Sequence, residues 1–345
     1  MAAASIKAVA RRAGVSIGTV SNVLNRPDLV APATRQRVLD SIAELGFVRN
    51  ESARQLRVGR SRTVGLVVLD LANPFFAEVA RGIEKQVAAS GNLLVLCNVD
   101  QDPVRESRYL DRLAEQRVQG VLIAPADADN PRLDQLVARG IPVVLVGRAS
   151  PRPDRCSVAV DNILGGRLVI RHLLEGGHRR IAFLGGPASQ PQVRDCFDGA
   201  AREAAAAEAA GRPVELRLAD TGELTLEAGR RAGEQIAATP ADERPTAVFC
   251  GSDLVALGVL QAMTAHGLRV PEDVAIAGYG DSEYAAGAAV PLTSVRQPRL
   301  EVGARAAELL LEEVRLNSDH RHEQILLPPR LVVRRSSSPS VPAGS

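Results

Sequence analysis

Residues 5–46 have the sequence SIKAVARRAGVSIGTVSNVLNRPDLVAPATRQRVLDSIAELG, whose apolar spacing predicts three short helices. Ser5 is a good N-cap, and the apolar residues after it recur at i, i+3, i+4 and i+7 until Gly14 ends the helix. Ser16 caps the second helix and Gly46 ends the third. The side chains predicted to form a three-helix core are Ile6, Val9, Ala10, Ala13, Val20, Val23, Leu24, Val38, Ile42 and Leu45.

The first two helices are joined by a turn that contains glycine, which predicts a helix-turn-helix. The outer face of the second helix is small and polar, as suits side chains that contact base edges while arginines hold phosphates. The alternative is a helical hairpin that serves only as a bundle element. The flanking arginines are Arg11, Arg12, Arg26 and Arg35, and the DNA contacts predicted in this region are Ser5, Ser16, Ile17, Gly18, Thr19, Ser21, Asn22, Asn25 and Arg35.

The charge of the chain is distributed unevenly. Residues 1–62 hold 11 Lys and Arg against 4 Asp and Glu, whereas the remaining residues hold 31 against 36. A basic head on an acidic body favours a polyanionic partner for the head alone, although a solvated basic surface without a partner is the alternative.

The whole segment from Ser5 to Arg57 resembles the DNA-binding head of LacI/GalR-type repressors. The resemblance implies that the second helix enters the major groove with Ile17, Gly18 and Asn22 at the base-choosing positions. Gly18 has no side chain, so Ile17 and Asn22 would carry most of the discrimination. Asn22 could pair with adenine, and Ile17 could meet a thymine methyl group.

The sequence of residues 50–57, NESARQLR, predicts a helix capped by Asn50. A helix of this length is too short to persist alone in water. The same resemblance implies a hinge helix that folds in pairs on the operator, where Leu56 enters the minor groove with Arg54 and Arg57 beside it. Ala53, Leu56 and Arg57 are the DNA contacts predicted in this segment. An ordinary packing role for Leu56 is the alternative. Residues 57–62 are rich in Gly and Arg and predict a linker.

After Thr63 the chain alternates β-branched runs such as VGLVVLD, VQGVLIAP, RIAFLGG and VAIAGYG with helical stretches. The predicted fold is a small all-α helix-turn-helix domain followed by α/β, with two doubly wound parallel-sheet lobes of periplasmic-binding-protein-like type. A ligand would bind between the lobes, beyond the carboxyl ends of the strands. In the resembled family the chain crosses between the lobes three times. The predicted divisions are a head at 1–49, a hinge and linker at 50–62, a sensor at 63–335 (lobe one about 63–160 plus 296–318, lobe two about 161–295 plus 322–333) and a disordered tail at 336–345.

The family resemblance also implies which residues face the effector. Two departures from the family pattern stand out, because Cys196 occupies the place of a usual arginine and Gly280 that of a usual aspartate. Arg194 is close in sequence, but two residues along a helix point about 200° apart, so it cannot substitute. We therefore expect a less polar or atypical effector, or none. The effector-binding set is Phe75, Phe76, Asp161, Arg194, Cys196, Ser252, Asp253, Gly280 and Asp281, with Asp253 supporting its loop and core packing as the alternative for both phenylalanines.

The sequence predicts no catalytic residues, metal site or cofactor. The widely spaced cysteines form no CxxC motif or Cys/His cluster, which argues against zinc and disulfides and favours a reducing cytoplasm. No histidine lies in a nucleophile elbow, an HExxH motif or a phosphate loop, and no signal peptide or membrane run is apparent. The cysteines are Cys97, Cys156, Cys196 and Cys250, and the histidines His172, His178, His266, His320 and His322.

Together these features predict a cytoplasmic regulator of transcription, a repressor by resemblance, and not an enzyme. A homodimer is expected to bind a near-palindromic operator in double-stranded DNA, with a tetramer left open. A small effector would alter operator affinity, in a direction that the sequence leaves open. The alternatives from other classes are a stand-alone solute-binding protein for transport and an α/β enzyme.

Overall fold

The computed structural model describes residues 5–47, 61–187 and 190–338. The chain divides between Ser61 and Arg62 into two compact units, the head and the sensor. The predicted hinge contacts Ala53, Leu56 and Arg57 lie outside the described residues. Within the described segments, no helix is long and apolar enough to cross a membrane.

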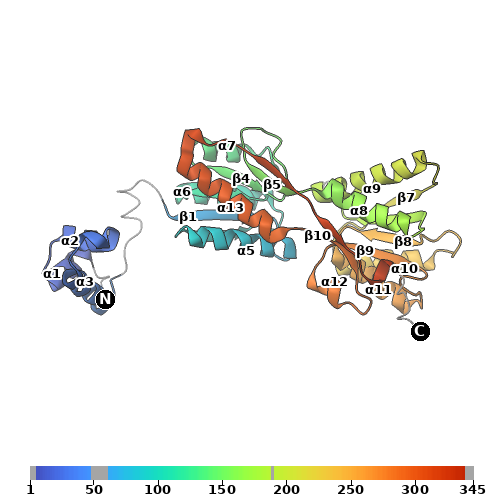
Figure 1. The fold of residues 1–345 in the computed structure, drawn as a ribbon, viewed down its shortest axis with the longest axis horizontal. Coiled ribbons are helices and arrows are strands. Elements are labelled where there is room, and N and C mark those ends of the chain that lie inside the picture. Colours follow the sequence, from blue (N-terminus) through green and yellow to red (C-terminus); the bar gives the residue numbers. More distant parts are fainter. Residues whose placement is uncertain (1–4, 48–60, 188–189, 339–345) are drawn as a thin grey trace. The chain divides into compact units, whose positions relative to one another are not determined.

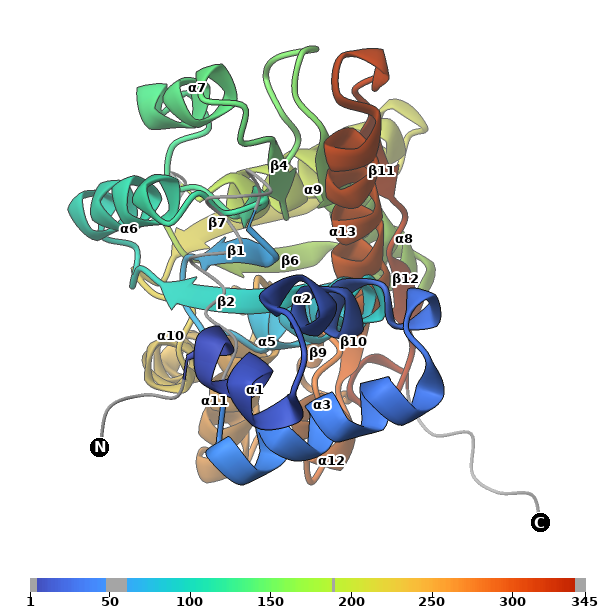
Figure 2. The ribbon, with the colours of Figure 1, turned by 90° about the vertical axis from the view of Figure 1, so that its left-hand side faces the viewer.

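The head contains the three predicted helices, which pack around one another in Figure 2. Ser5 and Ser16 cap the first two helices with their side chains, and Gly14 and Gly46 end the first and third with left-handed φ angles of 66° and 58°. Val9, Val20 and Val38 are fully buried among the other predicted core residues. The helices are α1 (Ile6–Ala13), α2 (Ile17–Asn25) and α3 (Pro32–Leu45), with a 3-10 turn, η1 (Pro27–Leu29), before α3.

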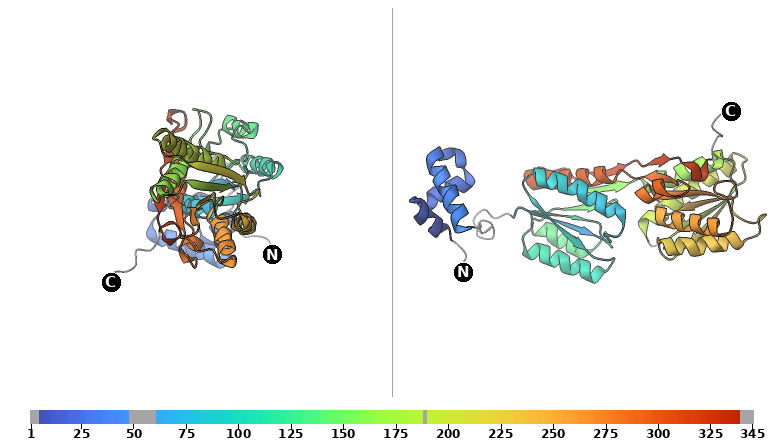
Figure 3. Two further views of the ribbon diagram at one scale, coloured as in Figure 1. Left: turned by 90° about the vertical axis from the view of Figure 1, so that its right-hand side faces the viewer. Right: turned by 90° about the horizontal axis from the view of Figure 1, so that it is seen from below.

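Lobe one of the sensor is a six-stranded sheet in the order β11-β5-β4-β3-β1-β2, and every pair is parallel. Its two apolar clusters place α5 and α13 on one face and α6 and α7 on the other (Figure 3). The elements are β1 (Thr63–Val68), α5 (Pro74–Ala89), β2 (Leu93–Asn98), α6 (Pro103–Glu115), β3 (Gly120–Ile123), α7 (Pro131–Ala138), β4 (Val143–Val146), β5 (Ser157–Val160), α13 (Arg299–Leu316), η2 (Asn317–Asp319) and β11 (Gln324–Leu327).

Lobe two repeats this plan with the order β12-β10-β9-β8-β6-β7. Only β12 is antiparallel, and it pairs with β10. Its elements are α8 (Asn162–Glu175), β6 (Arg180–Gly185), α9 (Pro191–Ala209), β7 (Glu215–Asp220), α10 (Leu226–Ala238), β8 (Ala247–Cys250), α11 (Asp253–Ala265), β9 (Ala275–Gly280), α12 (Glu283–Gly287), β10 (Thr293–Arg296), β12 (Arg330–Val332) and η3 (Arg335–Ser337).

The helices α5 and α13 lie side by side in Figure 1, and two glycines set their separation. A Cβ on Gly82 would lie 2.3 Å from the Leu300 carbonyl oxygen, and one on Gly303 would lie 2.1 Å from that of Val79. The two backbones are therefore in direct contact, which holds the start of α13 against α5.

The chain crosses between the lobes three times, as expected, but the third crossing is later than predicted. Residues 322–333 were assigned to lobe two, whereas Gln324–Leu327 pairs with Ser157–Val160 at the outer edge of the lobe-one sheet. The crossing lies between β11 and β12. The prediction was wrong because an alternating strand pattern shows which residues face inward but not which sheet the strand joins.

The tail prediction was wrong at its beginning. Residues 335–337 form a 3-10 turn in which Ser336 and Ser337 are buried. The Ser336 hydroxyl donates to the Ile276 carbonyl at 2.6 Å and accepts from the Thr293 N–H at 2.8 Å. These bonds hold a low-complexity segment on lobe two; residues 339–345 lie outside the described residues.

Candidate functional site

The outer face of α2 presents the three positions that were predicted to choose bases. Ile17 is 45% exposed, and Gly18 and Asn22 are also exposed. Val20 and Val23, on the other side of the helix, are buried in the head core. A helix that is buried on one side and carries small or polar side chains on the other suits contact with base edges.

The other polar side chains of α2 bond within the helix. The Ser16 hydroxyl accepts from the Thr19 N–H at 3.0 Å and lies 3.0 Å from the Thr19 hydroxyl. The Asn25 amide donates to the Ser21 carbonyl at 2.7 Å. These bonds fix the two ends of α2 and leave Ile17, its first residue, and Asn22 exposed.

The arginines around α2 differ in their surroundings. Arg12 forms an ion pair with Glu44 of α3, so part of its charge serves the head's own packing. Arg11 and Arg26 are exposed, whereas Arg35 is half-buried. Exposed guanidinium groups on either side of α2 can contact phosphates on both sides of a groove.

Phe75 and Phe76, at the start of α5, belong to the lobe-one core. Their rings meet edge to face, with centroids 5.2 Å apart, and both side chains are nearly buried. These positions fit core packing, which was the alternative to effector contact for both phenylalanines. Phe75 also touches the end of β4, since a Cβ on Gly147 would lie 3.2 Å from its ring.

Cys196 and Arg194 on α9 point in different directions, as their spacing predicts. Cys196 is fully buried in the lobe-two core, and burial raises the pKa of its thiol. Arg194 is exposed and lies 3.7 Å from Asp195. At the position where the family resemblance implies an arginine, this chain thus has a neutral buried thiol, and Arg194 does not replace that charge.

Asp161 and Ser252 are helix caps. Asp161 accepts from the Leu164 N–H at 2.8 Å at the start of α8, where the chain enters lobe two. The Ser252 hydroxyl accepts from the Val255 N–H at 3.3 Å at the start of α11. Both lie beyond the carboxyl end of a strand, which is the edge where a ligand of this fold binds.

Asp253 was predicted to support its own loop, and the structure shows it bonded to the loop after β9 and to β10. Its carboxylate accepts from the Ser294 hydroxyl at 2.5 Å and from the Ser282 N–H at 2.6 Å. Burial raises the pKa of this carboxyl, and the two hydrogen bonds act against that effect. The group is thus engaged inside lobe two and binds the loop to α11 and β10.

Gly280 occupies a place that a side chain would disturb. Its φ is 125°, and a Cβ there would lie 3.0 Å from the Arg299 guanidinium. That buried guanidinium donates to the Gly280 carbonyl. The residue that replaces the family's aspartate therefore makes room for an arginine from the start of α13.

The next residue, Asp281, is paired with two arginines. Its carboxylate is 2% exposed, forms an ion pair with Arg296 and lies 2.6 Å from Nη1 of Arg334. The one acid left at this strand end is therefore already neutralised by the chain itself.

An open pocket of about 410 Å³ lies where β10 continues into α13. It includes only two of the nine predicted effector residues, Gly280 and Asp281. Across it, Glu78 of lobe one lies 3.8 Å from Nη1 of Arg299. Most of the residues that line this pocket were not predicted. The sequence feature that could have revealed them is the segment SVRQPRLE, residues 294–301, in which charged side chains flank a proline at the end of a strand. The other lining residues are Arg296, Gln297, Pro298, Leu300 and Glu301.

Family models match both parts of the chain. Residues 5–50 match the bacterial regulatory proteins of the lacI family, and residues 170–337 match a periplasmic binding protein-like domain. The chain is 36% identical to the transcriptional repressor PurR of Aliivibrio fischeri over 97% of its own length and 98% of that protein. The chain belongs to the LacI family. It is also 33% identical to the ribose operon repressor of Escherichia coli K12, over 97% of this chain and all of that one.

Solved structures of LacI-family proteins have the same fold. The lac repressor dimer bound to operator and the anti-inducer ONPF matches with a TM-score of 0.84 and 27% identity, over 97% of this chain and 99% of that one. A complex of the regulator CelR with cellobiose is 34% identical, with a TM-score of 0.69 over 96% and 99%. This LacI-family chain is therefore a DNA-binding transcriptional regulator of the repressor type, with a sensor domain built to bind an effector.

Proposed function

We propose that two copies of this chain bind a near-palindromic operator in the cytoplasm through the exposed faces of their α2 helices. The observation that carries this proposal is the exposure of Ile17 and Asn22 on a helix whose other side is buried. One helix offers few base contacts, so a dimer is needed for a specific site. Exposed arginines beside α2 would supply the phosphate contacts that set the register.

Selection of bound fragments from random and genomic DNA by the full-length protein tests this role. We expect a two-fold symmetric consensus with half-sites about 10 base pairs apart. Weak, salt-sensitive binding without sequence preference would contradict it, because basic surfaces bind any duplex in that manner.

We further propose that the effector is less polar than a monosaccharide. The acids that a sugar's hydroxyls would need are engaged already, since Asp253 bonds within lobe two and Asp281 pairs with Arg296 and Arg334. Cys196 adds a buried thiol in place of a charged donor. Charge-assisted hydrogen bonds supply much of the strength in a buried polar site, and here they are made inside the protein.

Calorimetry on the full-length protein tests the effector class. The titrants are ribose and cellobiose, the sugars bound in structures of relatives, and a matched set of uncharged aromatic and aliphatic compounds. We expect no heat from the sugars; tight binding of either one would refute the proposal. If a ligand is found, linkage requires that it and the operator alter each other's affinity by the same factor.

The domain roles follow from the same proposal. The head ends at residue 49, residues 50–62 are a hinge and linker, and the sensor begins at residue 63. Nothing in this division calls for catalysis, and we propose that the protein is not an enzyme, in keeping with relatives that are transcriptional repressors.

A further inference from the structure

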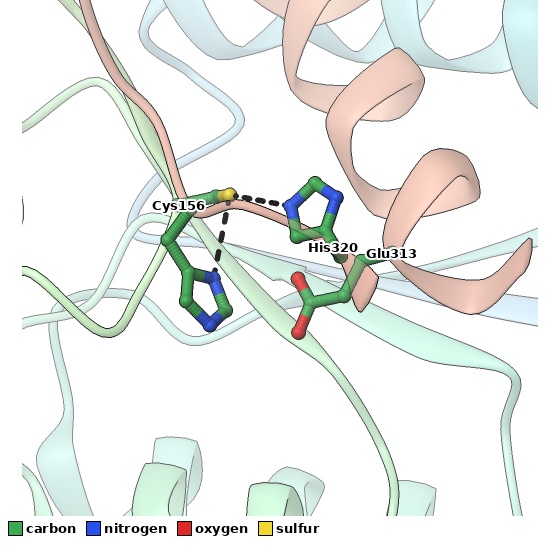
Figure 4. Close-up of side chains that lie close together, drawn as sticks. Cys156, Glu313 and His320 are labelled. Carbon is green, nitrogen blue, oxygen red and sulfur yellow. Dashed lines mark hydrogen bonds between the residues drawn. The ribbon is translucent and has the colours of Figure 1, made fainter. Parts of the chain in front are cut away.

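Four potential metal ligands meet at one corner of lobe one, where the sequence predicted no Cys/His cluster. Sγ of Cys156 lies 3.2 Å from Nε2 of His320 and 3.7 Å from Nδ1 of His322. A carboxylate oxygen of Glu313 completes the group, and the four ligand atoms all lie within 4.8 Å of one another. Figure 4 shows the Glu313 side chain extending from α13 toward His320 and Cys156. More than 150 residues separate Cys156 from the other three, so spacing along the chain gave no sign of the cluster.

We propose that Cys156, Glu313, His320 and His322 form a binding site for a zinc-class divalent metal ion. Cysteine, histidine and glutamate are the side chains that Zn²⁺ takes in proteins, and four of them suit a tetrahedral site. Bonds of about 2.3 Å to sulfur and 2.0–2.1 Å to nitrogen place neighbouring ligand atoms about 3.5 Å apart. The two measured Cys156–histidine distances bracket that value.

The surroundings of the cluster also suit a cation. Oε2 of Glu313 is buried and has no hydrogen-bond partner in the segments that the structure describes. A thiolate and a carboxylate together balance the charge of one divalent ion. The nearby cation Arg155 is paired with Asp134, since its Nη2 lies 2.6 Å from that carboxylate.

Backbone contacts hold the cysteine ready to bind. The Glu323 N–H donates to Sγ of Cys156 at 3.3 Å, and the Ser157 N–H donates to the Glu323 carbonyl at 3.0 Å. An N–H bond to a coordinating sulfur is a common support around metal ligands. His322 is exposed, so the ion can enter from solvent, and the thiol proton leaves to solvent as the ion binds.

The site is separate from the predicted effector site. All strands of the lobe-one sheet are parallel, so Cys156, just before β5, marks the edge at which every strand begins. The ligand edge of this fold lies beyond the carboxyl ends of the strands instead. Glu313 lies near the end of α13, and His320 and His322 precede β11, the last strand before the third crossing. An ion here would fasten β11 to β5 and α13, and so fix the lobe-one end of that crossing.

Metal titration of the full-length protein after treatment with a chelator tests the proposal. We expect one Zn²⁺ per chain by calorimetry and elemental analysis, and a rise in melting temperature on binding. Co²⁺ in the same site should give the near-ultraviolet absorption of a thiolate–metal bond. Less than one ion per chain would overturn the proposal, as would a Co²⁺ complex without that absorption.

Paired variants identify the ligands. His322→Ala removes an exposed ligand and should leave the fold intact, and Cys156→Ser removes the sulfur with little change in volume. Each should weaken Zn²⁺ binding by about 100-fold or more, since even outer-sphere partners of metal ligands contribute 10- to 100-fold. The matched controls are His266→Ala, at the C-cap of α11, and Cys97→Ser, a half-buried thiol elsewhere in lobe one. Equal affinity in the variants and the controls would overturn the proposal.

Discussion

The two predicted sites of this chain differ in how their side chains are held. On α2, Ile17 and Asn22 extend into solvent from a helix fixed by caps and a buried face. In the sensor, the predicted effector residues Cys196, Asp253 and Asp281 are buried and bound to their own neighbours. The comparison teaches that the head keeps its recognition groups available, whereas the sensor uses the corresponding groups to stabilise its fold.

The largest effect on stability is expected at Asp253. Asp253→Ala leaves the Ser294 hydroxyl and the Ser282 N–H without their buried acceptor, and should cost about 3–5 kcal/mol of sensor stability. Urea denaturation that monitors the sensor transition measures the loss. The exposed residue Asp242 supplies the control, because Asp242→Ala should stay within about 0.5 kcal/mol of the wild type. If Asp253→Ala and Asp242→Ala were equally stable, the proposal that Asp253 stabilises lobe two would be wrong.

A smaller loss is expected where the family's aspartate is restored. Gly280→Asp forces a side chain into a φ of 125° and against the Arg299 guanidinium, at a cost of about 1–3 kcal/mol. The same change at Gly287, where a Cβ would meet nothing, is the matched control. We expect the Gly280 variant to be less stable than the control and still unable to bind ribose in calorimetry. A stable Gly280→Asp protein that binds ribose would contradict the explanation given for this glycine.

The smallest effect on stability is expected on the exposed face of the head. A Cβ on Gly18 would meet only the Ser16 hydroxyl, at an ordinary 3.5 Å, and alanine favours a helix over glycine by up to about 1 kcal/mol. Gly18→Ala should therefore leave the head as stable as before or slightly more so, while the preferred operator sequence changes. Thermal melts and a repeated DNA selection measure both. Loss of folding would show that this face is packed rather than available.

The parts of the structure that depend on local sequence could be predicted. Ser5, Ser16, Gly14 and Gly46 mark the ends of the head helices because caps act within a few residues. The alternation of strands and helices likewise predicted two parallel-sheet lobes.

What depends on distant contacts could not be predicted. The assignment of β11 to lobe one, the burial of Ser336 and the meeting of Cys156 with His320 all join residues far apart in the chain. The pairing of Asp281 with Arg334 is of the same kind, since a carboxylate that looks available in the sequence is bound to a residue 53 positions later.

The most direct test of the difference between the two sites is the affinity of Asn22→Ala for the selected operator and for a shuffled duplex of equal length. A lost base contact costs about 1–3 kcal/mol in each half-site, so a dimer should lose at least about 30-fold in operator affinity while binding to the shuffled duplex and the melting temperature stay the same. Unchanged operator affinity, or an equal fall for both duplexes, would contradict the role of α2 as the helix that recognises the operator.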